Sequence, residues 1–269
     1  MDSQKAGKTG NGKMDSQKAG SRDSGKMGNQ LERTHIEEAE VGIGLNGQFE
    51  RTAMLIGEAS VKKLAGARVA VFGVGGVGGA CVEALARSGI GVIDLFDNDT
   101  VCLCNLNRQI VALHSTIGRY KTDVMAERVR DINPCCKVGS YRLFYAPETA
   151  GEVDLSAYDY IVDAIDTVAG KLELITRAKE AGVRIICSMG AANKLDPTRF
   201  VVADIYETET DPLARAVRKE LRARGIKDVK AVYSKEPPAV NCRPPASNST
   251  VPPVCGYILA AEVIKDLIA

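Results

Sequence analysis

The chain has 269 residues and a formal net charge of +1, and 45% of its residues are hydrophobic. This length allows one large domain or two small ones, and the near-zero charge excludes a global bias toward nucleic acid or membranes, so any basic surface must be local. No apolar stretch reaches the ~18 residues that span a bilayer, and the eight cysteines include no Cys-x-x-Cys pair, which argues against structural zinc. We expect reduced cysteines, a cytoplasmic protein and no membrane partner.

The beginning of the chain differs in composition from the remainder. Residues 1–33 are polar and glycine-rich, and the heptad at 1–7 is repeated at 14–20. We interpret residues 1–33 as a disordered extension or a tag. Residues 34–269 are expected to form one domain, in which 206–253 contain a basic helix and a Pro-rich crossover.

From residue 50 onward, short apolar runs alternate with segments of helical spacing. Helices are expected at 50–64 with a break near Gly57, and at 77–88, 121–132, 171–181, 212–224 and 256–267. Strands are expected at 69–72, 91–96, 138–144, 160–164, 183–187, 200–205 and 229–233. This alternation predicts an α/β fold with a Rossmann-like, mostly parallel sheet that carries helices on both faces.

A glycine-rich turn, Gly73-x-Gly75-Gly76-x-Gly78, joins the first strand to its helix. Its glycines let backbone N–H groups approach a phosphate, and the helix N-terminus favours the anion. The next strand ends at Asp97, 24 residues after the first glycine, where a dinucleotide fold binds a ribose hydroxyl. No Gly-Lys-Ser/Thr follows, so the turn is not a P-loop. Up to this point an NAD enzyme fits equally well.

Polar and charged residues after this acid favour a triphosphate. They are Asp99, Asn105, Asn107, Arg108, Gln109, Lys121 and Asp166. The cations among them suit a triphosphate, which carries more charge than the diphosphate of a dinucleotide. Because ligands of open parallel sheets bind beyond the carboxyl ends of the strands, Asp97, Asp166 and the glycine turn should converge on one edge. Asp166 there suits Mg²⁺, which needs only one or two carboxylates besides phosphate oxygens.

The order and spacing of these motifs over roughly residues 50–170 closely resemble the ThiF/MoeB-like adenylating superfamily, which includes ubiquitin-activating enzymes. The resemblance implies an adenylation domain that binds ATP and Mg²⁺, attack of a substrate carboxylate on the α-phosphate, and release of pyrophosphate. It implies that a phosphate loop is formed by Gly73, Gly75, Gly76 and Gly78, with Gly76 in contact with the phosphates, and that Asp97 holds the ribose with Asp99 nearby. It implies that phosphate is contacted by Asn105 and Arg108, in a motif that also contains Asn107 and Gln109. It further implies that Lys121 neutralises phosphate charge and that Asp166 positions Mg²⁺ and the adenylate. Arg51 resembles the family's N-terminal arginine that reaches into the neighbouring subunit, which implies a homodimer.

Later segments resemble one branch of this superfamily, the tRNA threonylcarbamoyladenosine dehydratases. These segments are 188–198, 204–205, 211–214, 233–236 and 251–267. The resemblance then spans about residues 49–269 and implies that the activated carboxylate is the threonyl carboxylate of a modified adenosine in tRNA, which closes into a ring with net loss of water. The stretch 239–250 is shorter than in many relatives, and its Cys242 is the best candidate for a cysteine that carries an acyl group.

A basic segment supports tRNA independently of the resemblance. Residues 213–235 contain eight basic residues and two acidic ones. Arg215, Arg218, Lys219 and Arg222 share helical spacing, so we predict a cationic stripe suited to RNA phosphates. The alternative is an ordinary solvated helix face.

Other interpretations stay open at this point. An adenylyltransferase for the C-terminal Gly-Gly of a ubiquitin-like or sulfur-carrier protein is the main alternative, followed by a non-catalytic nucleotide sensor and an NAD oxidoreductase. A sulfur-transfer partner such as a cysteine desulfurase is neither indicated nor excluded. Cys102, Cys104 and Cys187 are expected to be packing residues.

Overall fold

A computed structural model describes residues 47–269, and its regular elements follow the predicted alternation. The strands are β1 (Arg68–Phe72), β2 (Val92–Phe96), β3 (Lys137–Tyr141), β4 (Tyr160–Asp163), β5 (Arg184–Ser188), β6 (Phe200–Asp204) and β7 (Lys230–Ser234). The helices are α1 (Glu50–Ile56), α2 (Glu58–Gly66), α3 (Gly76–Arg87), α4 (Lys121–Ile132), α5 (Val168–Glu180), α6 (Pro212–Ala223) and α7 (Val251–Ile268). The expected extension at 1–33 lies outside the described residues.

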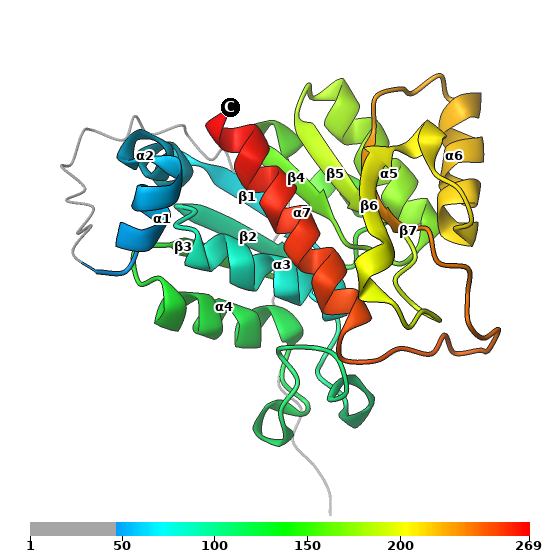
Figure 1. Cartoon of the computed structure of the whole chain (residues 1–269), viewed down its shortest axis with the longest axis horizontal. Helices are drawn as coiled ribbons and strands as arrows, with labels where there is room; N and C mark the ends of the chain where they lie inside the picture. Colours follow the sequence, from blue (N-terminus) through cyan, green and yellow to red (C-terminus); the bar gives the residue numbers. More distant parts are fainter. Residues whose placement is uncertain (1–46) are drawn as a thin grey trace, which may run out of the picture. The chain divides into compact units, whose positions relative to one another are not determined.

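The seven strands form one sheet in the order β3-β2-β1-β4-β5-β7-β6 (Figure 1). Every neighbouring pair is parallel except β6 and β7, which are antiparallel. The predicted mostly parallel α/β sheet is confirmed. The antiparallel strand β6 lies at the edge, where many otherwise parallel sheets carry such a strand.

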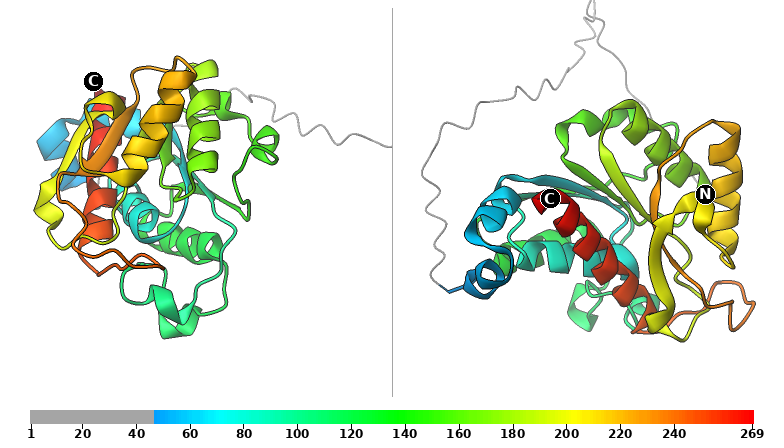
Figure 2. Two further views of the ribbon diagram at one scale, coloured as in Figure 1. Left: turned by 90° about the vertical axis from the view of Figure 1, so that its right-hand side faces the viewer. Right: turned by 45° about the horizontal axis from the view of Figure 1, so that its top comes forward.

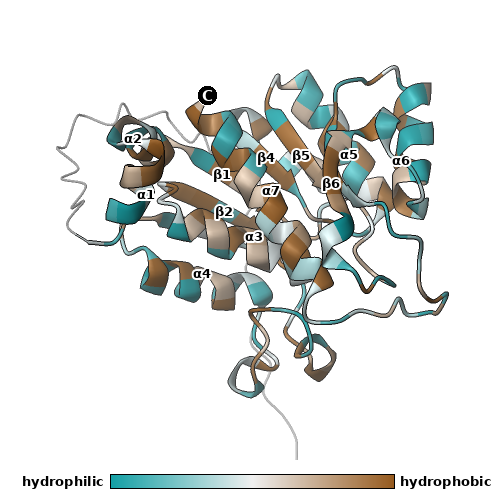
Figure 3. Cartoon of the chain, viewed as in Figure 1, coloured by the Kyte–Doolittle hydropathy of each residue, from teal (hydrophilic) through white to brown (hydrophobic). Residues whose placement is uncertain are grey.

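Alternating side chains of the central strands point into two separate cores. Val69 and Val71 of β1 belong to a core shared with α3, α4 and α7, whereas Ala70 and Phe72 belong to a core shared with α5 and α6. This period of two is what a strand covered on both faces requires. In Figure 3 the central strands are mostly brown, whereas the helices around them carry teal residues. Among the described helices, none is long and apolar enough to cross a membrane.

The structure corrects the predicted start of the last helix. α7 begins at Val251 instead of residue 256, and Pro252 and Pro253 stand in its first turn. Proline is tolerated there because the N–H groups of a first helical turn have no intrahelical acceptor. α7 lies across one face of the sheet in both views of Figure 2. Its Gly256 packs so closely on α3 that a Cβ would lie 2.2 Å from the Val77 carbonyl oxygen.

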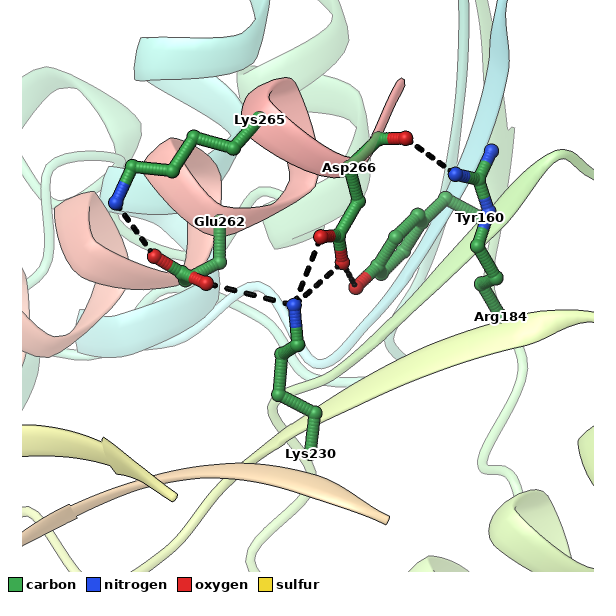
Figure 4. A network of polar contacts seen from close by, with 6 residues as sticks. All are labelled: Tyr160, Arg184, Lys230, Glu262, Lys265 and Asp266. Atoms are coloured by element: carbon green, nitrogen blue, oxygen red, sulfur yellow. Dashed lines mark hydrogen bonds and ion pairs between the residues drawn. The ribbon is translucent and has the colours of Figure 1, made fainter. Parts of the chain in front are cut away.

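A polar network fastens the far end of α7 to the sheet (Figure 4). Lys230 Nζ lies 2.7 Å from Asp266 Oδ2 and 3.4 Å from Glu262 Oε2. The Tyr160 hydroxyl donates to the same Asp266 oxygen at 2.6 Å. Because Tyr160 and Lys230 are the first residues of β4 and β7, this network marks the edge of the sheet where the parallel strands begin.

Candidate active site

β1, β2 and β4 end side by side at the opposite edge of the sheet. Phe72 pairs in register with Phe96 on one side and with Asp163 on the other. β2 and β4 therefore flank β1, and the strand order changes direction at this point, which is where open α/β sheets bind ligands. The structure brings together the three loops that carry the glycines, Asp97 and Asp166.

Two glycines of the loop after β1 have no room for a side chain. A Cβ on Gly78 would lie 1.8 Å from the Gly73 carbonyl oxygen, and a Cβ on Gly73 would lie 2.6 Å from the Ala164 carbonyl oxygen. Gly73 also has a φ of 90°, in the region that favours glycine. α3 then begins without a side-chain cap. Its first N–H groups are thus available at the sheet edge, an arrangement that binds anions.

Asp97 and Asp99 link this loop to Lys121. Asp97 Oδ2 accepts a hydrogen bond from the Val74 N–H at 2.7 Å, and its Oδ1 accepts from the Asp99 N–H at 2.8 Å. Lys121, whose side chain is 6% exposed, places Nζ 2.6 Å from Asp99 Oδ2. A buried lysine at a helix start opposes the helix dipole, so the acid beside it compensates. Lys121 therefore lies within this polar chain instead of at the open surface.

The segment 105–109 covers the same loop. Arg108 Nη1 donates to the Cys104 carbonyl at 2.9 Å and to Asn107 Oδ1 at 2.8 Å. Gln109 is buried, its Nε2 lies 3.9 Å from the place where a Gly75 Cβ would stand, and its Oε1 has no hydrogen-bond partner among the described residues. An unpaired buried polar atom costs about 1–3 kcal/mol. A polar ligand at the glycine loop would fit this orphaned acceptor.

Asn105 lies at the end of the short turn Leu103–Asn105 that precedes Arg108. It is buried, its Oδ1 accepts from the Cys102 N–H at 3.1 Å, and its Nδ2 lies 3.5 Å from Cys104 Sγ. The structure also joins Cys102 and Cys104 in a disulfide. The expectation that both cysteines are reduced packing residues was therefore wrong, because two thiols one residue apart become neighbours when the chain turns at Leu103–Asn105.

Asp163 and Asp166 have different environments. Asp163 is fully buried, and its Oδ1 accepts from the Ile165 N–H at 3.1 Å in the turn at the end of β4. Asp166 is exposed on the turn that follows. Lys171, which sequence reasoning did not single out, pairs with Asp163. The sequence pattern that could have indicated this pair is a lysine one turn into a helix that follows an acid at a strand end.

Arg51 lies far from the glycine loop of its own chain. It is exposed on α1, and the preceding Phe49 packs against Gly89, just beyond the end of α3. The glycine loop lies at the start of α3, a helix of 12 residues, so about 18 Å of helix separates it from the other end. Met54 and Leu55 beside Arg51 are 82% and 84% exposed.

Asn193 was missed from the sequence and anchors the Pro-rich segment. Its backbone exchanges hydrogen bonds with Ala239 and Ala246, and its Oδ1 accepts from the Ala246 N–H at 2.7 Å. Its φ of 60° is uncommon for a residue other than glycine. The residue after Ala246 is held by Asn107, whose Nδ2 donates to the Ser247 carbonyl at 3.0 Å. The segment from Ala239 to Ala246 thus closes back on Asn193, and the next residue, Ser247, contacts the phosphate motif.

The comparison with known proteins decides the family. The model of the ThiF family matches residues 49–269. This chain belongs to the ThiF family. It is similar, at 44% identity over 82% of this chain and 94% of the relative, to a protein of Bacillus subtilis (strain 168) named tRNA threonylcarbamoyladenosine dehydratase.

Solved structures agree with this assignment to the ThiF family. A structure of Escherichia coli tRNA N6-threonylcarbamoyladenosine dehydratase, TcdA, in complex with AMP has a TM-score of 0.80 and 34% identity, and covers 85% of this chain and 96% of that chain. A structure of the same enzyme in complex with ATP has a TM-score of 0.78 and 35% identity, with the same coverage of 85% and 96%.

In this ThiF-family chain, the basic helix α6 starts at the rim of the site. Asp211 caps the helix by accepting from the Ala214 N–H at 2.9 Å, and its other oxygen accepts from the N–H of Gly190, two residues beyond β5, at 2.9 Å. Ala214, Val217 and Leu221 form the buried face. The helix is therefore amphipathic, with its cationic side toward solvent.

The predicted stripe is only partly free on that outer face. Arg215, Lys219 and Arg222 are exposed, whereas Arg218 is half-buried and donates to Thr208 Oγ1 at 2.7 Å. The guanidinium of Arg222 lies 5.4 Å from the centre of the Tyr206 ring. A pocket lies at the C-terminal end of α6, on the edge of the sheet away from the glycine loop. It is lined by Asp204, Tyr206, Arg222, Gly225, Lys227 and Asp228.

The remaining candidate cysteines of the ThiF-family chain differ in burial. Cys187 is fully buried, and burial raises the pKa of its thiol well above the usual range. It is a core residue, as expected. Cys242 is exposed in the Pro-rich segment, with Sγ 3.5 Å from Asn193 Oδ1.

Proposed function

We propose that this chain is an ATP-dependent tRNA threonylcarbamoyladenosine dehydratase. The observation that carries the proposal is the convergence of the glycine loop, Asp97, Lys121 and Asp166 on one edge of the sheet, in a chain similar along most of its length to TcdA in complex with ATP. The threonyl carboxylate of the modified adenosine attacks the α-phosphate of ATP and pyrophosphate leaves. A nucleophile of the carbamoyl group then attacks the acyl carbon and expels AMP, which closes the ring with net loss of water.

The residues of the site divide this work between phosphate binding and orientation. The N–H groups at the start of α3 would donate hydrogen bonds to phosphate oxygens, and Lys121 and Arg108 would neutralise charge that develops as pyrophosphate leaves. Asp97 binds the ribose hydroxyls, and the Gln109 amide supports the loop. Asp166 and phosphate oxygens would hold Mg²⁺, whose charge favours departure of pyrophosphate, and this donor set fits a largely hydrated ion.

We place tRNA along α6 and a second copy of the chain at α1. Arg215, Lys219 and Arg222 would contact RNA phosphates along a helix that begins at the site rim. Arg51, exposed beside Met54 and Leu55, would reach the site of the second copy. Mixing inactive Arg51→Ala with inactive Asp166→Asn should restore up to about a quarter of the activity, since random pairing leaves one intact site in half of the dimers.

The decisive experiment measures pyrophosphate release with three substrates. tRNA that carries threonylcarbamoyladenosine should stimulate release, whereas unmodified tRNA and a carrier protein that ends in Gly-Gly should not. Mass spectrometry of the digested tRNA should find the modified nucleoside lighter by one water. Release with the carrier protein but not with the modified tRNA would reject the proposal in favour of a carrier-activating enzyme. Asp166→Asn should abolish the reaction, and an active Asp166→Asn would place the adenylation site elsewhere.

A further inference from the structure

One ion pair of the described residues is completely enclosed. Lys171 Nζ lies 2.9 Å from Asp163 Oδ2, and both side chains are 0% exposed. Every other ion pair within residues 47–269 has at least one partner whose side chain is 30% or more exposed. Removing two charges from water is costly, and apolar residues of similar volume are often at least as stabilising. Core stability alone is therefore a weak reason for this pair.

The pair brackets the turn that carries Asp166. Asp163 is the last residue of β4, three residues before Asp166, and Lys171 stands in the first turns of α5, five residues after it. The second oxygen of Asp163 accepts from the Ile165 N–H at 3.1 Å, inside the turn. The end of β4, the turn and the start of α5 are thus joined through one carboxylate.

The same turn touches the glycine loop. The Ala164 N–H donates to the Phe72 carbonyl at 2.8 Å. A Cβ on Gly73 would lie 2.6 Å from the Ala164 carbonyl oxygen, and a Cβ on Gly78 would lie 3.2 Å from the Ala164 methyl carbon. A shift of the turn would therefore move Asp166 relative to the phosphate loop or push the two apart.

We propose that the Asp163–Lys171 pair is a positioning device for Asp166. By holding the turn between β4 and α5, it fixes the Asp166 carboxylate against the glycine loop in the geometry that adenylation requires. The inference rests on the proposed function, because it takes Asp166 as part of the adenylation site. Supporting residues of this kind change activity because the reacting groups tolerate little displacement.

The test separates position from stability by removing both charges. Replacing Lys171 alone would strand a buried carboxylate and impair folding. Asp163→Leu/Lys171→Met keeps volume but removes the bond to Ile165. Asp163→Asn/Lys171→Gln removes the charges but keeps an oxygen that can accept from Ile165. The matched control is Arg68→Met/Asp94→Leu. These residues form a 2.7 Å ion pair in which the Asp94 side chain is 4% exposed, and Arg68 is the first residue of β1, away from the site.

Pyrophosphate release with tRNA carrying threonylcarbamoyladenosine is measured at a temperature where circular dichroism finds the variants folded. We expect the Leu/Met variant to lose roughly 10–100-fold in kcat and to need more Mg²⁺ for half-maximal rate, with little change in the KM for tRNA. The Asn/Gln variant should recover part of kcat. The Arg68/Asp94 control should keep the kcat and the Mg²⁺ requirement of the original chain.

Unchanged kcat and Mg²⁺ requirement in the Leu/Met variant would overturn the inference, as would an equal loss in the Arg68/Asp94 control. If the Leu/Met variant does not fold, the Asn/Gln variant decides: a lower kcat with a raised Mg²⁺ requirement supports positioning, and unchanged values reject it. Asp166→Asn is assayed in parallel. Activity in that variant contradicts the proposed function itself, whereas an inactive Asp166→Asn beside a fully active Leu/Met variant contradicts only the role of the pair.

Discussion

Asp97 and Val74 join the tip of the second strand to the glycine loop, through a 2.7 Å hydrogen bond from the Val74 N–H to the Asp97 carboxylate. The same carboxylate accepts from the Asp99 N–H at 2.8 Å. The shape of the loop and the position of Lys121, which pairs with Asp99, therefore depend on one acid. A residue expected to bind ribose also shapes the phosphate site before any ligand arrives.

Asp97→Ala should weaken ATP binding more than the loss of a ribose contact alone. Hydrogen bonds to a charged group contribute about 1.5–3 kcal/mol each, so losing one or two of them should raise the Kd for ATP by roughly 10–100-fold or more. Isothermal titration calorimetry with ATP measures the change. Asp131→Ala, at an exposed acid near the end of α4, is the control. An Asp97→Ala variant that binds ATP as tightly as that control would contradict the role of Asp97.

Gly78→Ala tests the packing of the glycine loop. Helix propensity alone favours alanine over glycine by about 1 kcal/mol. The new Cβ would however lie 1.8 Å from the Gly73 carbonyl oxygen, and backbone cannot yield cheaply, so we expect a net loss of about 1–3 kcal/mol or more. Urea unfolding measures it. Gly151→Ala, where no atom lies within 4 Å, should change stability little. A Gly78→Ala variant at least as stable as the original chain would rule out this packing.

Opening the Cys102–Cys104 disulfide should weaken nucleotide binding modestly. The disulfide joins two residues that contact the phosphate motif, since the Cys102 N–H donates to Asn105 and the Cys104 carbonyl accepts from Arg108. Ordering a loose side chain on binding costs about 0.5–1.5 kcal/mol, so reduction should raise the Kd for ATP by about 2–10-fold. The measurement compares ATP binding with and without dithiothreitol. Cys102→Ser/Cys104→Ser should bind like the reduced chain and ignore the reductant, and a reductant effect that persists in it would have another origin.

Acid should remove the contribution of Asp266. Burial favours the neutral acid, but hydrogen bonds from Lys230 and Tyr160 outweigh it and hold the pKa of Asp266 below its ordinary value. A lowered folded-state pKa gives stability that is present above the unfolded pKa of about 3.9 and is lost as pH falls through the folded value. Asp266→Asn should lower Tm by about 2–4 °C at pH 7. Thermal melts should find this gap shrinking below about pH 4, and a gap independent of pH would exclude the charge as its cause.

The exposed cations of α6 should set the salt dependence of tRNA binding. Because Arg218 is engaged with Thr208, the sharper variant neutralises its neighbours, Arg215→Gln/Lys219→Gln/Arg222→Gln. The logarithm of the binding constant falls linearly with the logarithm of the salt concentration, and each lost phosphate contact makes this negative slope shallower by about 0.7–0.9. Fluorescence anisotropy with tRNA at several salt concentrations measures the slope. Neutralising Lys62, Arg130 and Lys137, which are exposed on other elements, is the matched control. Equal slopes for the two triple variants would remove α6 from the RNA surface.

Local residue patterns correctly predicted the elements whose ends are set by the residues next to them. The helix expected at 121–132 is observed as Lys121–Ile132, because Asn133 and Pro134 end it. β3 stops at Tyr141 although the apolar pattern continues to residue 144. An edge strand continues only as far as its single neighbour, and β2 ends at the partner of Tyr141. The extent of β3 was therefore not readable from its own residues.

Positions at strand ends likewise placed the glycine loop, Asp97 and Asp166 on one edge, because parallel strands must end together. Contacts between distant segments could not be read in this way. Asn193 binds Ala246, and Asn107 binds Ser247. Neither contact can be predicted from a periodic pattern of residue types. The bond between Cys102 and Cys104 depends on the turn at Leu103–Asn105, which residue types alone did not reveal.

The strand order also constrains how the chain is made. β7 lies between β5 and β6 although it is the last strand to be synthesised, so a ribosome that has completed β6 has made an edge strand whose only neighbour does not yet exist. Until β7 emerges, β5 exposes an unpaired edge of backbone groups, a surface prone to intermolecular pairing. Nascent chains arrested between α6 and β7 should therefore depend on chaperones more than chains arrested after α7.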